Sequence, residues 1–272
     1  MFLWPTNKYN NMNKNLLFVA IMCALGMMFK ACTEKENVGG TITDSLLVEP
    51  TDTIPRPTEG EWIDLGLPSG LLWASCNLGA NTPTEYGNYY AWGETQPKEV
   101  YDLITYTHTY SANGYNDWIA KYCNLSGYGN IDTLTILEDV DDAATANLGN
   151  GARTPTKEEW GEVYRNCTIK YVHYSNNGED YDYITHIGGH LLTGPNGNSI
   201  FLPCAGYRKG NGYGGYRNSS RGYYWSSSLY VDDPHKAWFF YTHVDVYSDC
   251  GIFPAHRTRR DYGLSVRAVR PQ

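Results

Sequence analysis

Five cysteines follow residue 60, and their spacing decides which thiol chemistry the chain can support. They are Cys76, Cys123, Cys167, Cys204 and Cys250. Two thiolates a few residues apart can hold a soft metal such as copper(I), but the nearest two, Cys167 and Cys204, are 37 residues apart. Five is an odd number, so at least one thiol stays outside any disulfide. Cys204 and Cys250 are candidate disulfide partners, and buried, unreactive thiols are the open alternative.

Histidines and acids are the other candidate metal ligands. The nearest histidine pair, His186 and His190, lies in "THIGGH", where two glycines favour a turn over a helix face. The remaining candidates are scattered: His173, His243 and His256, and the acids Asp232, Asp233, Asp245 and Asp249. Those acids offer the oxygen ligands that calcium prefers, but they lack the spacing of a calcium loop. We therefore predict no metal and no cofactor.

Nucleophile and phosphate-binding motifs are not evident in the sequence. No serine lies in a Gly-x-Ser-x-Gly setting, and the glycines of "GNGYGGYR" do not follow a strand and open a helix. The sequence therefore predicts a protein that does not catalyse a reaction.

The stretch "AGYRKGNGYGGYRNSSRGYYWSSSLY", residues 205–230, is the candidate ligand-binding surface. Its aromatic and cationic side chains are suited to stacking on sugar rings and to protein recognition. The candidate ligand-binding residues are Tyr207, Tyr213, Tyr216, Arg217 and Trp225. Tyr213 and Tyr216 stand between glycines and are predicted to be exposed. Packing of Tyr207 and Trp225 inside the fold is the alternative.

The N-terminal residues are typical of an export signal. Lys14 precedes an apolar run of 14 residues, Leu16 to Phe29. This run is too short to span a membrane, and its length is typical of an export signal. Ala31-Cys32 resembles a lipoprotein cleavage junction, although Phe29 and Lys30 depart from that motif. We expect residues 1–31 to be a signal peptide and Cys32 to carry the lipid; plain secretion and an uncleaved anchor remain alternatives. Translation can start at Met1 or Met12.

Residues 32–60 are rich in proline and acids and are predicted to form a flexible tether. Glu34 and Glu36 follow Cys32 closely and resemble the signal that takes Bacteroidetes lipoproteins to the cell surface. We expect an outer-membrane lipoprotein of the cell envelope, with its leaflet left open.

The charge of the chain argues against a nucleic-acid partner. The formal net charge is −8, and removal of residues 1–31 leaves 18 basic and 29 acidic residues, a net charge of −11. Such a surface repels phosphate backbones.

Residues 61–272 carry the periodic patterns of a folded domain. A helix is predicted over 138–148, with acids at its start, and a second over 154–167, where Thr156 and Glu159 fit a capping box. Trp160, Val163 and Tyr164 share one face of that second helix. Period-two segments after Cys167 predict strands over 168–174, 181–187, 198–204, 236–244 and 263–270. In the last one, Ser265 and Arg267 face away from the apolar residues.

Several ordered stretches carry a family resemblance. "EWIDLGLPSGLLWASCNLGA", "EYGNYYAWGET", "DDAATANLGNGARTPTKEEWGEV", "IFLPCAGYR", "GYYWSSSL" and "YGLSVRAVR" together resemble the Fibrobacter succinogenes major paralogous domain of Bacteroidetes lipoproteins. That family is similar to the formylglycine-generating enzymes. The resemblance implies an α+β, C-type-lectin-like single domain with two short helices, twisted antiparallel sheets, long loops and neighbouring termini.

These observations predict a lipid-anchored, non-catalytic binding module for a glycan or a cell-surface protein. A structural or adhesive component of a surface assembly is the main alternative. A formylglycine-generating-type oxidase is a lesser one, because the pair of active-site cysteines in that enzyme family has no counterpart in the sequence spacing.

Overall fold

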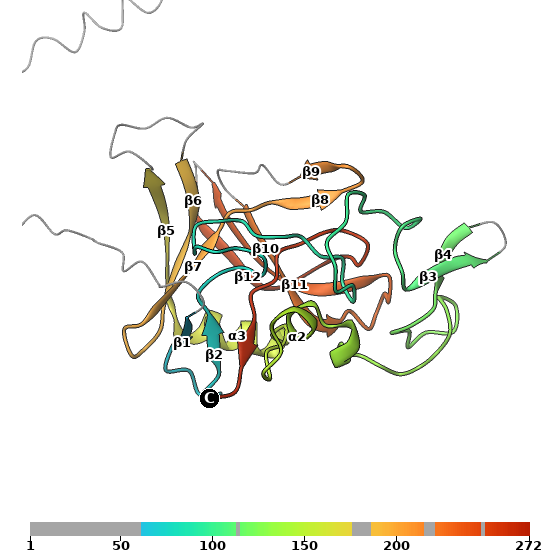
Figure 1. Ribbon diagram of the computed structural model, residues 1–272, viewed down its shortest axis with the longest axis horizontal. Coiled ribbons are helices and arrows are strands. Elements are labelled where there is room, and N and C mark those ends of the chain that lie inside the picture. The colour runs from blue at the N-terminus through green and yellow to red at the C-terminus, as the bar shows by residue number, and fades with distance from the viewer. Residues whose placement is uncertain (1–60, 113–114, 176–185, 215–220, 246–247) are drawn as a thin grey trace, which may run out of the picture. The chain divides into compact units, whose positions relative to one another are not determined.

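The structure is a computed structural model that describes residues 61–112, 115–175, 186–214, 221–245 and 248–272. This part of the chain is a mostly-β domain with two short α-helices and several small antiparallel sheets (Figure 1). The predicted signal peptide, Cys32 and the tether lie outside it. Among the described residues, no helix has the length and apolar character needed to cross a membrane.

The elements follow one another in this order. The strands are β1 Trp62–Asp64, β2 Leu72–Ala74, β3 Thr109–Ala112, β4 Tyr115–Ile119, β5 Thr168–Ser175, β6 His186–Thr193, β7 Ser199–Pro203, β8 Tyr207–Lys209, β9 Gly212–Gly214, β10 Arg221–Leu229, β11 Lys236–Asp245, β12 Ser248–Arg259 and β13 Val269–Arg270. The helices are the 3-10 helix η1 Asp139–Asp141 and the α-helices α2 Ala143–Leu148 and α3 Lys157–Asn166.

The first and last strands of the domain belong to one sheet. β2 lies in its centre, with β1 on one side and β13 on the other. Trp73 is the central residue, opposite Ile63 in β1 and Val269 in β13. The two ends of the folded domain are therefore joined by hydrogen bonds.

Two further three-stranded sheets, β5-β6-β7 and β10-β11-β12, form the body of the domain (Figure 1). α3 packs against the β10-β11-β12 sheet, where the indole of Trp160 stacks on Phe240 with ring centroids 4.5 Å apart. Strands predicted from the period-two segments 168–174, 198–204 and 236–244 are present as β5, β7 and β11.

The predicted capping box at α3 is confirmed. Thr156 Oγ1 accepts from the backbone N–H of Glu159, and the Glu159 carboxylate accepts from the N–H of Thr156, which satisfies donors that the helix leaves unpaired. Of the three residues that share one face of α3, Trp160 and Val163 are buried, whereas Tyr164 is exposed.

The helix predicted over 138–148 is divided into two elements. The 3-10 helix η1 ends at Asp141, and α2 begins after Asp142, whose carboxylate accepts from the N–H groups of Ala144 and Thr145. Asp142 also accepts from Thr154, both from its N–H and from its hydroxyl. Asp142, one of the acids at the start of the predicted helix, is thus the cap of α2, and its hydrogen bonds with Thr154 fix α2 to the segment before α3.

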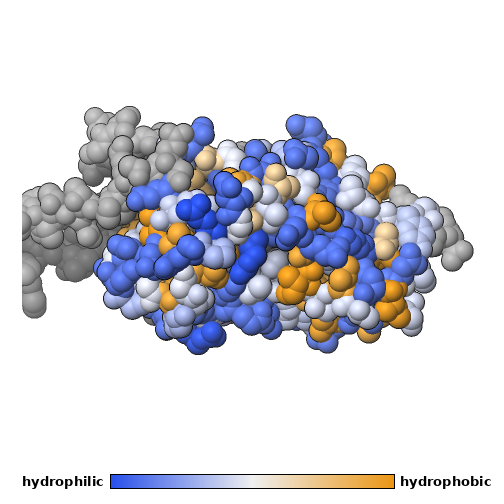
Figure 2. All heavy atoms as spheres, turned by 60° about the horizontal axis from the view of Figure 1, so that its bottom comes forward, coloured by the Kyte–Doolittle hydropathy of each residue, from blue (hydrophilic) through white to orange (hydrophobic). Residues whose placement is uncertain are grey.

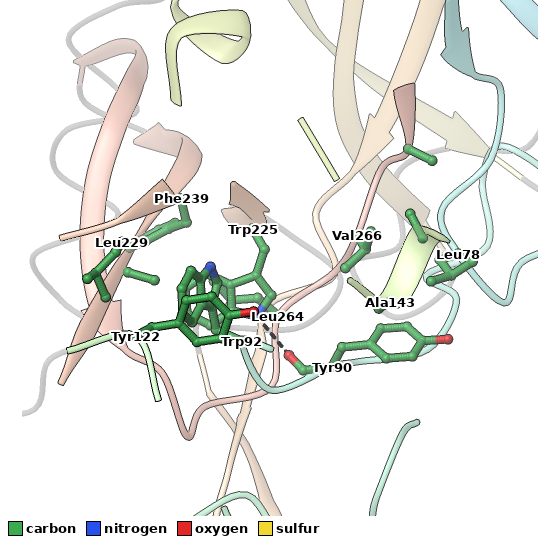
Figure 3. Close-up of a cluster of buried hydrophobic side chains, with 13 residues drawn as sticks. Leu78, Tyr90, Trp92, Tyr122, Ala143, Trp225, Leu229, Phe239, Leu264 and Val266 are labelled. Atoms are coloured by element: carbon green, nitrogen blue, oxygen red, sulfur yellow. Dashed lines mark hydrogen bonds between the residues drawn. The ribbon is translucent and has the colours of Figure 1, made fainter. Parts of the chain in front are cut away.

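The core consists of two main clusters of buried side chains. In the first, shown in Figure 3, Trp225 Nε1 donates a hydrogen bond of 2.7 Å to the carbonyl oxygen of Tyr90. Trp92 and Tyr122 meet edge to face in the same cluster. Because the indole N–H groups of Trp92 and Trp225 both donate to carbonyl oxygens, these two large rings pack without leaving a donor unpaired.

The last predicted strand, 263–270, is a strand only at Val269–Arg270. Leu264, Val266 and Ala268 do share the first core cluster. Ser265 and Arg267 point elsewhere, as the pattern predicts, but both are 0% exposed. The other side of this segment is therefore a polar interior rather than a solvent-facing surface.

Candidate binding site

The β8–β9 hairpin carries the exposed aromatic residue of the predicted ligand-binding stretch. A two-residue loop joins the strands, and its first residue, Gly210, has a φ of 56°, a conformation that glycine adopts without strain. Arg208 exchanges backbone hydrogen bonds with Gly263, and Gly210 exchanges them with Tyr101. The hairpin is thereby held at fixed positions on the domain, and in Figure 1 it lies on the opposite side from α3.

One pocket, of about 570 Å³, lies on one side of this hairpin, and a second, of about 390 Å³, lies on the other. We call the smaller one the Tyr213 pocket; it is lined by Gly87, Asn88, Tyr89, Pro97, Lys98, Glu99, Tyr101, Arg208 and Tyr213. We call the larger one the Lys209 pocket; it is lined by Tyr101, Asp102, Leu103, Ile104, Lys209, Gly210, Arg259, Asp261 and Tyr262. Tyr101 contributes to both walls.

Arg208 and Tyr213 form the hairpin wall of the Tyr213 pocket. They are paired across the strands, and the guanidinium carbon of Arg208 lies 4.4 Å from the centre of the Tyr213 ring. The guanidinium donates a hydrogen bond of 2.8 Å to the backbone carbonyl oxygen of Glu99. Tyr213 is 52% exposed and meets Tyr89 edge to face. The pocket thus presents an aromatic ring beside a positioned cation.

The Lys209 pocket combines two cations with two carboxylates that are already hydrogen-bonded. Arg259 donates to both carboxylate oxygens of Asp261, over 2.9 and 3.3 Å. Asp102 Oδ1 accepts from the backbone N–H groups of Ile104 and Thr105. A hydrogen bond with the Tyr262 hydroxyl raises the pKa of Lys209, so its ammonium is charged at neutral pH.

The predicted ligand-binding residues have separate positions in the structure. Tyr213 is exposed, which confirms that prediction. Tyr207 is half-buried between Tyr223 and Tyr262 and lines neither pocket. Trp225 is 1% exposed and belongs to the first core cluster, which agrees with the alternative that it packs inside the fold. Tyr216 and Arg217 lie outside the described residues.

Pocket residues that the sequence did not indicate come from distant segments. Tyr89, Lys98 and Tyr101 lie more than 100 residues before the hairpin, and Arg259 to Tyr262 lie some 45 residues after Tyr213. The one signal in the sequence is the clustering of tyrosine with asparagine and lysine in the segment 86–101, which resembles the composition of the hairpin.

The structure describes the side chains of four of the five cysteines that follow residue 60. Cys76, Cys123, Cys167 and Cys204 are thiols, and Cys123 and Cys204 are buried. The alternative of buried thiols fits Cys123 and Cys204, and the side chain of Cys250, the candidate partner of Cys204, lies outside the described residues. Cys204 Sγ lies 3.8 Å from Nδ1 of His190. Burial raises the pKa of Cys167 to about 11, which keeps this thiol protonated at neutral pH.

The candidate metal ligands whose side chains the structure describes are not gathered at one place. Within the described ranges, no group of three or more histidine, cysteine or acidic side chains is arranged to hold a metal ion. Asp233 pairs with Lys236 and His235, and His190 is wholly buried. The side chains of His173, His186, Asp245 and Asp249 lie outside the described residues.

The face of the molecule in Figure 2 is mostly polar, with hydrophobic residues in small separate patches. Comparison of the chain with family models, with curated proteins and with solved structures finds no match. The function is therefore argued from the chemistry of the two pockets and from the patterns of the sequence.

Proposed function

We propose that this protein is a carbohydrate-binding lipoprotein of the cell envelope that catalyses no reaction. The observation that carries the proposal is the position of Tyr213. Its ring is 52% exposed in a pocket of about 390 Å³, and Arg208 holds a guanidinium 4.4 Å from the ring centre.

The residues of the Tyr213 pocket fit the surface of a sugar. A pyranose ring has apolar C–H faces, which stack on aromatic rings, and hydroxyl groups at its rim, which need hydrogen-bond partners. Tyr213 offers the aromatic face, while Asn88, Lys98 and Glu99 line the same pocket with polar groups. The pocket is of the size that small ligands occupy in proteins.

The cellular location in this proposal rests on the N-terminal residues. The apolar run Leu16 to Phe29 is followed closely by Ala31-Cys32, which supports a lipid on Cys32. The acidic and proline-rich segment 33–60 supports a tether between that lipid in the outer membrane and the folded domain. A tether of this composition would let the domain reach ligands away from the lipid surface.

The family and fold in the proposal are those of the resemblance. We propose a major paralogous domain with a C-type-lectin-like arrangement, similar to the formylglycine-generating enzymes. The joining of β1 and β13 in one sheet and the two short helices support that arrangement. An oxidase of the latter family remains the weaker alternative, since Cys123 and Cys204 are buried.

A structural or adhesive role is the second candidate, and a row of aromatic rings supports it. Tyr223, Tyr241 and Phe253 lie on adjacent strands of the β10-β11-β12 sheet, with ring centroids 5.0 and 5.9 Å apart. Phe253 is 46% exposed. Exposed aromatic residues of this kind are enriched at protein interfaces.

A glycan-array screen of the purified protein tests the proposal. We expect selective binding that Tyr213→Ala abolishes and that Tyr164→Ala retains, because Tyr164 is similarly exposed, at 47%, on α3. Repeating the screen with a calcium chelator tests the metal-free prediction. A blank array from folded protein would contradict the carbohydrate proposal and favour the protein-binding role of the aromatic row.

A further inference from the structure

We infer that the hairpin selects anionic carbohydrate, that is, sugars that carry a carboxylate or a sulfate; this inference rests on the proposed function. It starts from two neighbouring residues of β8, Arg208 and Lys209. Successive side chains of a strand point to opposite faces, and accordingly Arg208 lines the Tyr213 pocket while Lys209 lines the Lys209 pocket. Each pocket therefore receives one cation from the hairpin.

Neither cation is neutralised by a carboxylate in the part of the chain that the structure describes. The ion pairs found there involve other residues. Arg208 contacts the carbonyl oxygens of Glu99 and Asn211 and the hydroxyl of Tyr213, all of them neutral acceptors. These contacts fix the direction of the guanidinium without cancelling its charge.

The two acids of the Lys209 pocket, Asp102 and Asp261, already accept hydrogen bonds from other donors, whereas the exposed Glu99 lines the Tyr213 pocket. Asp261 is 3% exposed and accepts from Arg259, and Asp102 accepts from two backbone N–H groups. In the Tyr213 pocket Lys98 pairs with Glu94. Lys209 and Arg208 thus remain the cations whose charge is available to a ligand.

The sequence around the hairpin is rich in basic residues and contains no acid. Residues 183–231 contain four basic residues, Arg208, Lys209, Arg217 and Arg221, and no acid, in a chain with a net charge of −8. Arg208 and Lys209 are adjacent in this acid-free segment, and two neighbouring cations on an acidic protein attract small anions to the hairpin.

The chemistry of the two cations suits carboxylated and sulfated sugars. A guanidinium matches the two oxygens of a carboxylate or sulfate with parallel N–H donors, and an ammonium supplies a compact charge. The guanidinium carbon of Arg208 lies 4.4 Å from the centre of the Tyr213 ring, and the ammonium of Lys209 lies 5.4 Å from the centre of the Tyr262 ring, so each pocket sets an aromatic ring beside a cation. A sugar ring with an acidic substituent would contact the aromatic ring and the cation at the same time.

The test is a glycan array that pairs neutral glycans with carboxylated and sulfated ones, followed by titration of the best binders at low and high salt. We expect the anionic glycans to bind about tenfold more tightly than their neutral counterparts. High salt should remove most of that preference. Lys209→Gln should weaken binding of the anionic glycans several-fold and leave the neutral ones unchanged. Lys170→Gln, on the exposed surface of β5, is the matched control.

The outcomes separate this inference from the proposed function. Equal binding of neutral and anionic glycans, with no effect of salt or of Lys209→Gln, would overturn the charge selection and leave the carbohydrate proposal in place. Loss of every glycan signal in folded wild-type protein would overturn both. Arg208→Lys, which keeps the charge but not the fork of donors, should retain the preference for anions over neutral glycans while binding both more weakly.

Discussion

Two arginines, Arg267 in the core and Arg208 at the hairpin, show how differently the same side chain is used. Arg267 is 0% exposed and makes five hydrogen bonds of 2.7–3.1 Å, to Asn77 Oδ1 and to three carbonyl oxygens. A guanidinium has five N–H donors, so none is left over. Burial lowers the pKa of Arg267 to about 10, still far above neutral pH.

Arg208, in contrast, makes three hydrogen bonds, two of which are 3.4 and 3.5 Å long. It is half-buried and lines a pocket. A polar group whose donors are all satisfied inside the protein serves the fold, whereas a partly satisfied one at a pocket can still bind a ligand. This contrast separates the polar residues of the core from those of the candidate site.

Replacement of Arg267 should have the largest effect on stability. Arg267→Gln leaves several of the four acceptors, which lie in the segments 74–77 and 201, buried without a donor. We expect the free energy of unfolding to fall by roughly 3–5 kcal/mol, measured by chemical denaturation. Arg267→Lys should lose less, since it keeps the charge and some donors. A loss below about 1 kcal/mol would contradict the structural role of Arg267.

The pattern of the sequence predicted the direction of Arg267 but not its burial. Alternation placed Arg267 opposite Val266 and Ala268, which is correct; that both sides of the segment are enclosed depends on Phe201 and Asn77, which are distant in sequence. The capping box at Thr156 was predictable because its partners are three residues apart. Local patterns predict local structure, whereas enclosure is a property of the whole chain.

The candidate site shows the same limit. The exposure of Tyr213 follows from its flanking glycines and was predicted. The pocket in front of it depends on Tyr89 and Tyr101, more than 100 residues earlier in the chain, and no sequence spacing reports that proximity. Trp225 lies only 12 residues after Tyr213, yet its ring is in the core, because β10 is buried on both faces at this point: Tyr224 belongs to one core cluster and Trp225 to the other.

His190 provides a second test of the core, through pH. It is 0% exposed, and burial, together with the neighbouring His243, lowers its pKa to about 4, below the value of about 6.5 for an unfolded chain. Between these two values the unfolded state binds a proton that the folded state does not. The stability from neutral His190 is therefore complete above pH 6.5 and is lost as the pH falls towards 4.

We expect the contribution of His190 to the free energy of unfolding to fall by about 2–3 kcal/mol between pH 7 and pH 4. Denaturation of the wild type and of His190→Gln, at a series of pH values from 7 to 4, measures it as the difference between the two curves. The stability of His190→Gln should depend less on pH over this range. His256→Gln, at an exposed histidine, should follow the wild type. Parallel curves for wild type and His190→Gln would show that the buried ring titrates normally.

Arg208→Gln should have the smallest effect on stability of these substitutions. It is also the sharpest test of the contrast between Arg208 and Arg267, because both arginines are replaced by the same residue. Its ring contact with Tyr213 and its hydrogen bond to Glu99 lie at a partly solvated surface, so water can replace what is lost. We expect the free energy of unfolding to change by less than about 1 kcal/mol, while glycan binding is strongly weakened.

Denaturation and glycan titration of Arg208→Gln and Arg267→Gln, carried out side by side, decide the point. A large stability loss at Arg208 would place it with the core arginine and would mean that its contacts to Glu99 and Tyr213 hold the hairpin together. Unchanged stability with unchanged binding would remove Arg208 from the site. Stability retained and binding lost at Arg208 is the result that distinguishes a ligand-facing cation from one that serves the fold, since Arg267 then loses both.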